Sequence, residues 1–544
     1  MLPRVAHTRP APRSTGGAVL ALLLLLFGVV AGATLAVVVA SRAFGLMVED
    51  DAFMFVRYAH NILEHGRIAW NPGGPPTYGP TSLFYLVVVV SVRALVGEAS
   101  ASVAVLSSLV CGLAFLMGVI ALAWRAADCA GGRRLAAVAC VLLALAWAAD
   151  DVGAHCVTGM DTTFALAWAT LLIHLGVGWE RRAERGWSVA LGIVGGMSLA
   201  ARPELLLYPA SIGLVAAPRR AARLLAVTAA TAIIVAVAAW AYFGSPLPLS
   251  FYVKSIVRYE GAMDAAYRDV AARELAAFVR VYWLLLLPIA IRLLRDALRR
   301  RWSLTRFESA CLIATLLYVS YHRFFVLPIM PHYQRFFYPT LPAIVLLAVR
   351  SAGSVAISIR LPVRLGVAAP IAATVTSIAL AATLLPLWQR AVPRLRSSAP
   401  FFRIAAIDNH AGSGRRYWYR LEQVSALPEE VVLAATEIGL PGVLNLEKKI
   451  VDLSGLNDPH FARHGFDADR LFQNEPPDWI YMPHPDYVAL TRAIRAHPVF
   501  RSEYDALRPG TTLPLAIRRT SPHYARMRAI LRQAGRGATT PRGG

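Results

Sequence analysis

The sequence predicts a polytopic α-helical membrane protein with about 11–13 transmembrane helices and a C-terminal extracytoplasmic α/β domain. Of the 544 residues, 57% are hydrophobic and 16% are charged, whereas soluble domains average about 25% charged residues. Residues 20–40 form a run of 21 residues without a charge, which meets the roughly 20 apolar residues that a bilayer-spanning helix needs. This run is longer than the roughly 7–15-residue apolar core of a cleaved signal peptide, and many apolar stretches follow it.

The basic residues lie mainly between the apolar stretches. The formal net charge is +22, from 55 Lys and Arg against 33 Asp and Glu, and basic segments occur at 180–186, 218–223 and 295–306. This placement indicates cytoplasmic loops under the positive-inside rule, so we expect membrane lipids and no nucleic acid as partners. The five cysteines show neither metal-ligand spacing nor a disulfide framework.

A polar segment, 41–81, follows the first span and is predicted to be the first extracytoplasmic loop. Apolar stretches then recur at 82–96, 101–124, 135–149, 162–179, 187–201, 204–217, 224–243, 278–294, 307–326, 338–350 and 366–388. We place the less basic loops on the outside, at 150–161, 244–277 and 326–337. Three stretches separate 41–81 from 150–161, which would put these loops on opposite faces. Either 82–96 is re-entrant or the boundaries differ, and the number of spans stays open.

The transmembrane domain therefore covers 1–388, and the tail, 389–544, forms a second domain outside. Val- and Ile-rich stretches at 429–439, 448–455 and 477–484 alternate with polar linkers, which predicts short strands in an α/β domain. Asp452 and Asp458 match no EF-hand spacing, and we interpret them as turn residues. The last residues, 535–544, are predicted to be disordered.

A helix is predicted from about residue 51, directly after the first span. Apolar residues at three- and four-residue spacing form one face, namely Ala52, Phe55, Val56, Ala59, Ile62 and Leu63. The opposite polar stripe is in line with Asp50 and consists of Arg57, His60, Asn61 and Glu64. Such a helix suits the membrane interface. A single aspartate would be enough to cap the start of this helix. The sequence has three acidic residues there, Glu49, Asp50 and Asp51. Because charged groups are costly beside a membrane, this excess indicates a function at the membrane edge.

Residues 49–85, "EDDAFMFVRYAHNILEHGRIAWNPGGPPTYGPTSLFY", resemble the first extracytoplasmic loop of GT-C glycosyltransferases. The closest likeness is to the bacterial branch that contains the terminal arabinofuranosyltransferases. The chain departs from that branch at 77–82, where "TYGPTS" stands without the usual preceding acid. Five more likenesses follow in the expected order: "TGMDTTF" (158–164), "ARPELLL" (201–207), "YFGSPLPLSFYVKS" (242–255), "HYQRFFYPTLPAIVLL" (332–347) and "ATEIGLPGVLN" (435–445).

The resemblance implies an enzyme that moves a sugar from a polyprenyl-phosphate donor to a glycan or lipid acceptor at the outer membrane face. Attack on the anomeric carbon needs a base near the acceptor hydroxyl, and a carboxylate suits that role. The resemblance points to Asp50 or Asp51, and the shared polar stripe slightly favours Asp50. The leaving phosphate needs preplaced cations. The candidates for donor-phosphate or substrate binding are Arg57, Asn61, Tyr78, Asp161, Arg202, Glu204, Lys254, His332 and Arg335.

Several of these residues have a purely structural alternative. Lys254 and Arg335 could extend to the interface, Asp161 could cap a helix, and Arg202 could pair with Glu204 inside the membrane. A monophosphate donor needs a divalent cation less than a diphosphate donor does. We therefore predict no metal and no other cofactor, although some GT-C enzymes use a divalent cation.

We expect this protein in the bacterial inner (plasma) membrane. Three hypotheses remain for its function. The first is a transferase for a pentose such as arabinofuranose, which acts on a cell-envelope glycan. The second keeps the fold but transfers a hexose such as mannose to protein or lipid. The third is a non-enzymatic transporter or flippase. Transporters often carry inverted repeats, and the acidic segment at 49–51 has no second copy in the sequence.

Overall fold

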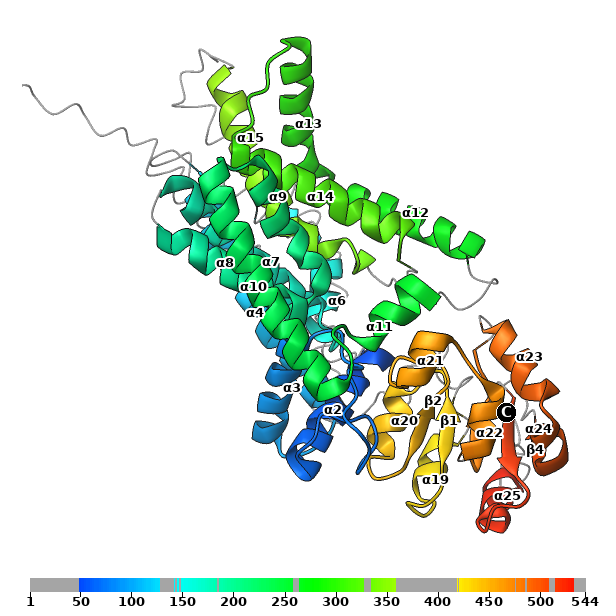
Figure 1. The fold of residues 1–544 in the computed structure, drawn as a ribbon. Coiled ribbons are helices and arrows are strands. Elements are labelled where there is room, and N and C mark those ends of the chain that lie inside the picture. The colour runs from blue at the N-terminus through cyan, green and yellow to red at the C-terminus, as the bar shows by residue number, and fades with distance from the viewer. Residues whose placement is uncertain are drawn as a thin grey trace, which may run out of the picture.

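The computed structural model describes residues 48–127, 141, 144–145, 148–182, 185–257, 264–326, 334–358, 418, 420–474, 476–484, 487–507 and 514–532. The first predicted span, the apolar stretch 366–388, His332 and the predicted disordered end lie outside these residues. Figure 1 shows an elongated bundle of helices with a separate α/β part packed against one of its ends. The two parts meet at helix α2 (Asp50–His65).

Most helices of the bundle coincide with predicted apolar stretches, whereas the helices at 149–157 and 264–281 lie mostly in the predicted loops 150–161 and 244–277. Its helices are α3 (Leu83–Val96), α4 (Ala101–Ala126), α6 (Ala149–Val157), α7 (Thr162–Arg181), α8 (Arg185–Ala201), α9 (Leu207–Val215), α10 (Pro218–Phe243), α12 (Asp264–Val281), α13 (Trp283–Leu298), α14 (Arg306–Phe324) and α15 (Leu341–Ser358). Short turns of helix join them, namely η1 (Pro203–Leu206), α11 (Leu249–Phe251), the π-helix η2 (Tyr252–Val257) and η4 (Tyr338–Thr340).

Three of the described helices, α4, α7 and α10, are long and apolar enough to cross a membrane. The pair α12 and α13 would make a fourth, but a bend of 85° separates its two helices. The sequence predicted one continuous span at 278–294, and this boundary is wrong because the chain breaks at Tyr282. The Tyr282 side chain is buried and donates a hydrogen bond to the hydroxyl of Tyr338 at 2.8 Å. The predicted loop 150–161 also differs, since most of it belongs to α6.

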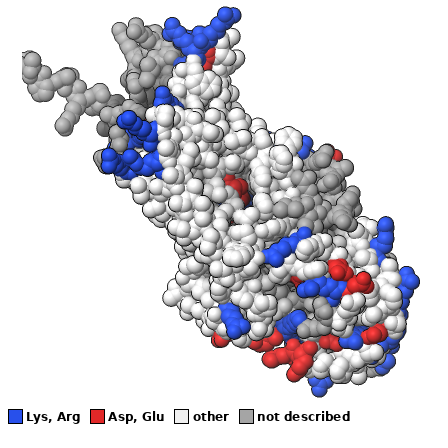
Figure 2. All heavy atoms as spheres, viewed as in Figure 1, with Lys and Arg blue, Asp and Glu red and all other residues white. Residues whose placement is uncertain are grey.

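The surface of the bundle is apolar between two charged ends. On α10, Ile233, Ile234 and Trp240 are more than 60% exposed. Figure 2 shows Lys and Arg at the far end of the bundle and mixed charges over the α/β part, with few charged side chains between them. An exposed apolar belt of this kind is typical of a surface that faces lipid.

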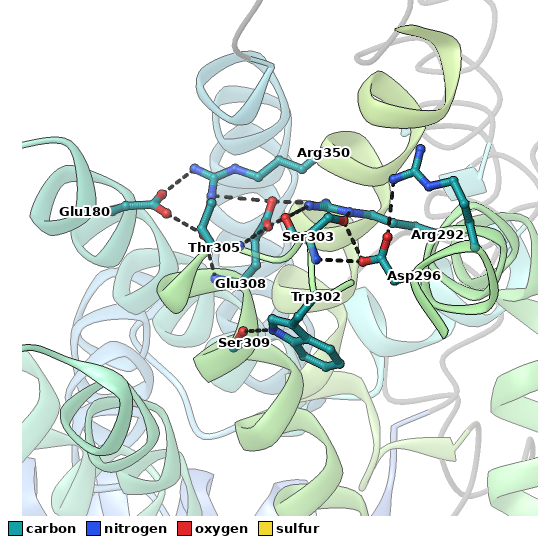
Figure 3. Close-up of polar contacts among 10 residues, drawn as sticks. Glu180, Arg292, Asp296, Trp302, Ser303, Thr305, Glu308, Ser309 and Arg350 are labelled. Carbon is teal, nitrogen blue, oxygen red and sulfur yellow. Dashed lines mark hydrogen bonds and ion pairs between the residues drawn. The ribbon is translucent and has the colours of Figure 1, made fainter. Parts of the chain in front are cut away.

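The far end of the bundle carries a polar network that joins four helices (Figure 3). Arg350 of α15 bonds to Glu180 of α7 at 2.6 Å and lies 3.8 Å from Glu308 of α14. Glu308 accepts hydrogen bonds from Arg292 of α13 and from the backbone of Thr305. This end is also basic, with exposed Arg181, Arg182, Arg185, Arg219, Arg299, Arg300 and Arg301.

The α/β part holds a five-stranded sheet with the order β2-β1-β3-β5-β4. Its strands are β1 (Leu433–Ala435), β2 (Ile450–Asp452), β3 (Trp479–Tyr481), β4 (Tyr504–Leu507) and β5 (Leu515–Arg518). The strands β2, β1 and β3 run parallel, and β5 is antiparallel to both β3 and β4. The prediction of strands within 429–439, 448–455 and 477–484 is confirmed.

Helices flank this sheet, namely α19 (Leu421–Ser425), α20 (Gly439–Leu444), α21 (Pro459–His464), α22 (Ala468–Asn474), α23 (Val488–Ala496), α24 (Pro498–Glu503) and α25 (Tyr524–Arg532). Asp458 accepts bonds from the N–H groups of His460 and Phe461 at the start of α21. Asp452 accepts bonds from Ser454 and Asn457. Both aspartates therefore stabilise turns and caps, as the sequence predicted.

Three of the four residues in the polar stripe of α2, Arg57, His60 and Asn61, are buried, although an interfacial helix would expose them, and Glu64 is the exposed member. Arg57 is fully buried and donates to the carbonyls of Gly442, Asn445 and Lys448 at 2.7–2.8 Å. Hydrogen bonds to these three carbonyls offset the free-energy cost of removing the guanidinium from water. The polar stripe of α2 thus joins the α/β part to the bundle, while the apolar face of α2 packs on α3 and α4.

Candidate active site

A cavity of about 500 Å³, including space open to solvent, lies where the bundle meets the α/β part. Segments far apart in the chain line it: the first half of α2, residues 79–81, the start of α7, the end of α8, α11, η2, the residues before η4, and Leu456 of the α/β part. Its charged lining consists of two carboxylates and three cations, Asp51, Asp161, Arg202, Lys254 and Arg335. The excess of one positive charge suits an anionic ligand.

Asp51 contributes the carboxylate on the α2 side of this cavity. It is the second residue of α2 and is partly exposed. Its Oδ2 lies 3.5 Å from Nη2 of Arg335, whose side chain is 7% exposed. Arg335 follows Gln334, a non-glycine residue with a φ of 55°. This turn directs Arg335 toward the cavity beside Phe336, over whose ring the guanidinium lies at 5.1 Å from the centroid.

Asp161 and Arg202 form a second ion pair in the cavity wall. Asp161 occupies the N-cap position of α7 but its side chain makes no cap hydrogen bond. It instead accepts a bond from Thr81 at 2.8 Å and lies 3.3 Å from Nε of Arg202. Arg202 has an extended backbone, as expected for a residue before a proline, here Pro203. Its buried Nη1 has no hydrogen-bond partner among the described residues.

Lys254 is the third cation and lies in the π-helix η2. Single π-turns are frequent at functional sites, because the extra residue re-aims a side chain. No ion pair or hydrogen bond is found between its ammonium group and any residue that the structure describes. Burial lowers the pKa of Lys254 to about 8, and Arg335 and Arg202 add to this effect against the opposing charge of Asp51.

A second cavity of about 500 Å³ shares Arg202 and Lys254 with the first. Glu204 lines it and lies 3.6 Å from Arg202, 3.7 Å from His322 and 3.3 Å from the hydroxyl of Tyr318. His322 is 5% exposed and neither of its ring nitrogens has a hydrogen-bond partner in the described part of the chain. This cavity therefore offers a carboxylate and an imidazole next to the cations.

Four predicted site residues lie outside both cavities. Asp50 is buried, and its two oxygens accept hydrogen bonds from the N–H groups of Gly439 and Leu440 at 2.9 and 2.7 Å. Burial raises the pKa of Asp50 to about 7, a value that would suit a base. The geometry opposes that role, because both oxygens are engaged at the start of α20.

The other three residues make structural contacts outside the cavities. Arg57 holds the α/β part, as described above. Asn61 donates to the carbonyls of Ala69 and Trp70. Tyr78 is buried and stacks on Phe243 with ring centroids 4.8 Å apart. His332 lies outside the described residues. The structure thus assembles Asp51, Asp161, Arg202, Glu204, Lys254 and Arg335.

Sequence reasoning missed several residues of the lining. Tyr321 and His322 lie in the last turn of α14, and their only signal was a cluster of polar and aromatic residues at the end of an apolar stretch. Ser250 lines both cavities and belongs to the same segment as Lys254, residues 242–255. Leu456 comes from the α/β part, and no local pattern could place it beside Asp51.

Comparisons with known proteins cover both parts of the chain. A family model described as "Domain of unknown function (DUF8728)" matches residues 414–534, which include the five-stranded sheet. No curated protein matches the sequence.

The fold resembles two crystal structures of ArnT from Cupriavidus metallidurans. The structure bound to undecaprenyl phosphate has a TM-score of 0.51 and 16% identity, and the match covers 94% of this chain and 99% of that chain. The apo structure has a TM-score of 0.52 and 17% identity, with 90% and 97% covered. At this identity the likeness concerns the fold, and it extends over both the bundle and the α/β part. The chain therefore has an ArnT-like fold.

Proposed function

We propose that this protein is an integral-membrane glycosyltransferase that moves a sugar from a polyprenyl-phosphate donor to a glycan or lipid acceptor. The observation that carries the proposal is the single cavity in which the Asp51 carboxylate faces Arg202, Lys254 and Arg335. A carboxylate beside an anion-binding cluster matches a displacement that needs a base and a stabilised phosphate. The ArnT-like fold supports it, since one of the two solved structures was determined with undecaprenyl phosphate.

The cavity residues account for each step of such a transfer. The acceptor hydroxyl oxygen attacks the anomeric carbon, and the bond from that carbon to the donor phosphate oxygen breaks. The hydroxyl proton passes to Asp51. The negative charge that develops on the leaving polyprenyl phosphate is stabilised by Lys254 and Arg202, whose buried Nη1 is free to donate. Arg335 holds the Asp51 carboxylate in place through the contact at 3.5 Å.

The charge distribution supports a location in the bacterial inner membrane with the cavity on the extracytoplasmic side. The exposed arginines at the ends of α7, α10 and α13 gather at one end of the bundle, and such clusters favour the cytoplasmic face. The cavity lies at the opposite ends of the same bundle, beside the start of α7 and the end of α8. The α/β part would therefore be extracytoplasmic, where a lipid-linked sugar meets an envelope acceptor.

The ordered motif likenesses favour a pentose such as arabinofuranose as the transferred sugar and a cell-envelope glycan as the acceptor. A hexose such as mannose, transferred to protein or lipid, keeps the same cavity and the same chemistry. The second cavity supplies the groups that would select among sugars, because Glu204 and His322 can bond to ring hydroxyls beside the phosphate site.

The decisive experiment incubates the purified chain in detergent with a panel of synthetic polyprenyl-phosphate pentoses and hexoses and with glycan acceptors. We expect transfer from one class of donor, and Asp51→Asn should lower the rate at least about 100-fold, the usual minimum contribution of a general base. Glu49→Gln is the matched control, because it removes a neighbouring acid that does not line the cavity. Its activity should equal that of the wild type.

Full activity in Asp51→Asn would show that the base is assigned to the wrong residue. Absence of transfer from every donor, together with movement of a polyprenyl phosphate across a liposome membrane, would replace the enzyme with a flippase.

A further inference from the structure

A group of metal-ligating side chains lies on α2 away from both cavities. Nε2 of His60 lies 2.9 Å from Oε1 of Glu447, and Nε2 of His65 lies 3.2 Å from Oε2 of the same carboxylate. One ligand atom from each of the three residues falls within 4.8 Å of the others. His60 is buried, whereas His65 and Glu447 have side chains that are 31% and 40% exposed. An ion from solvent can therefore reach this group.

The separations fit the coordination of a small divalent ion. Zinc binds imidazole nitrogen and carboxylate oxygen at about 2.0–2.2 Å, so two ligands of a tetrahedral ion lie about 3.3–3.5 Å apart. The two nitrogen-to-oxygen distances, 2.9 and 3.2 Å, reach this range after a small movement of the exposed side chains. Both histidines turn Nε2 toward the carboxylate, and both are on one helix, with rings 5.9 Å apart.

We propose that His60, His65 and Glu447 form a site for a divalent transition metal, best suited to Zn²⁺, with a water molecule as the fourth ligand. Two imidazoles and one carboxylate favour such ions over Mg²⁺ or Ca²⁺, which prefer oxygen ligands. A purely hydrogen-bonded cluster would need an Nε2–H donor on each histidine, both directed at the same carboxylate. A metal ion instead uses all three groups in their deprotonated forms and balances the charge of Glu447.

The site would act as a clamp between the two parts of the molecule. His60 and His65 lie in the second half of α2, and Glu447 lies in the segment between α20 and β2. Asp50 already joins the start of α2 to α20, and Arg57 joins its middle to the carbonyls of Gly442 and Asn445. A metal at His65 would fasten the remaining end of the helix that carries Asp51. The role would be structural, because none of the three ligands lines either of the two cavities described above.

The test measures metal binding by the full chain, purified in detergent without a polyhistidine tag and treated with a chelator. Calorimetric titration with Zn²⁺ should show one tight equivalent. Titration with Co²⁺ should give the visible absorption of a four-coordinate ion. His65→Ala and Glu447→Gln should each weaken the binding at least about 100-fold, since even the loss of an outer-shell partner costs up to that much. Both side chains are exposed, so these variants are expected to fold.

The matched control is the double variant His460→Ala/His464→Ala. These residues form another imidazole pair, on α21, with ring centroids 5.0 Å apart and Asp467 at 3.8 Å from His460. The tight equivalent should survive in this variant. Tight binding that persists in both His65→Ala and Glu447→Gln, or that disappears with His460 and His464, would overturn the proposal. A wild-type chain that binds neither ion would overturn it as well. Because the readout is binding, these outcomes are independent of whether the protein transfers a sugar.

Discussion

At the scale of single residues, two adjacent aspartates face different parts of the molecule. Asp50 is 6% exposed and bonds to the backbone of α20, while Asp51 lines the cavity. Consecutive residues of a helix point about 100° apart, so one turn of α2 can both bind the α/β part and present a carboxylate to the cavity. Asp50 therefore attaches the α/β part, and Asp51 is the proposed base. Substitutions at the two positions should separate these roles.

Asp50→Ala should destabilise the protein without removing the proposed base. The change leaves the N–H groups of Gly439 and Leu440 without their acceptor, which costs about 1–3 kcal/mol for buried groups. We expect a lower thermal midpoint in detergent and a smaller loss for Asp50→Asn, which keeps one carbonyl oxygen. Asp51→Asn should lower the midpoint less than Asp50→Ala, because it removes a contact to Arg335 but leaves no backbone N–H group without its acceptor. A stable Asp50→Ala protein that is inactive would instead identify Asp50 as the base.

Lys254 should make phosphate binding depend on pH. Its pKa is lowered to about 8, so its positive charge is present below pH 8 and is lost as the pH rises above it. Polyprenyl phosphate loses its second proton near pH 6 and keeps a constant charge in this range. We expect the Kd for undecaprenyl phosphate to be about tenfold higher at pH 9 than at pH 7. In Lys254→Arg, where the guanidinium stays charged, the Kd should be nearly constant. If the Kd of Lys254→Arg rose between pH 7 and pH 9 as much as that of the wild type, the titrating group would be another residue.

At the scale of elements, the contact between α2 and α20 depends on a glycine. A Cβ atom added at Gly439 would lie 1.7 Å from the backbone oxygen of Asp50 and 3.0 Å from its Cγ. No side chain can enter this space unless α20 moves away from α2. The start of α20 therefore approaches α2 closely enough for both of its first N–H groups to reach one carboxylate.

Gly439→Ala should loosen the α/β part from the bundle. Overpacking of this kind typically costs about 1–3 kcal/mol, and the shift should also disturb Asp51 on the neighbouring turn. We expect faster cleavage between the two parts in limited proteolysis of the full chain, together with slower sugar transfer. Gly186→Ala is the control, because a Cβ there meets nothing within 4 Å. Equal protease resistance in the two variants would contradict the importance of this contact.

The helices also show which features of the fold could be predicted from the sequence. Continuous apolar runs predicted α4 and α7 within two residues of their observed ends, because such runs have few other stable conformations. The break at Tyr282 coincides with a buried hydrogen bond to Tyr338, 56 residues away, which no local pattern reports. Periodicity placed Arg57 on a polar stripe, but three of its carbonyl partners lie 385 to 391 residues away. Their identity requires the tertiary structure, and so does the separation of Asp50 from Asp51.

At the scale of the whole molecule, charge and polarity divide the protein into three zones. One end of the bundle is basic and is joined by the network of Glu180, Arg292, Glu308 and Arg350. The middle exposes apolar side chains on α10. The other end holds the cavity and the α/β part. The proposed donor, with its long polyprenyl tail, would lie along the apolar middle while its phosphate reaches Lys254, so this division suits the lipid-linked substrate that we propose.

The division predicts opposite accessibility for the two ends in intact cells. We expect an impermeant thiol reagent to label Glu430→Cys, an exposed position of the α/β part, and to leave Arg301→Cys at the basic end unlabelled until the membrane is permeabilised. The described native cysteines 111, 156 and 311 are buried, and the wild-type chain corrects for labelling of the others. Labelling of Arg301→Cys from outside, with protection of Glu430→Cys, would invert the topology. The cavity would then face the cytoplasm, and its donor would have to be a lipid-linked sugar of the inner leaflet.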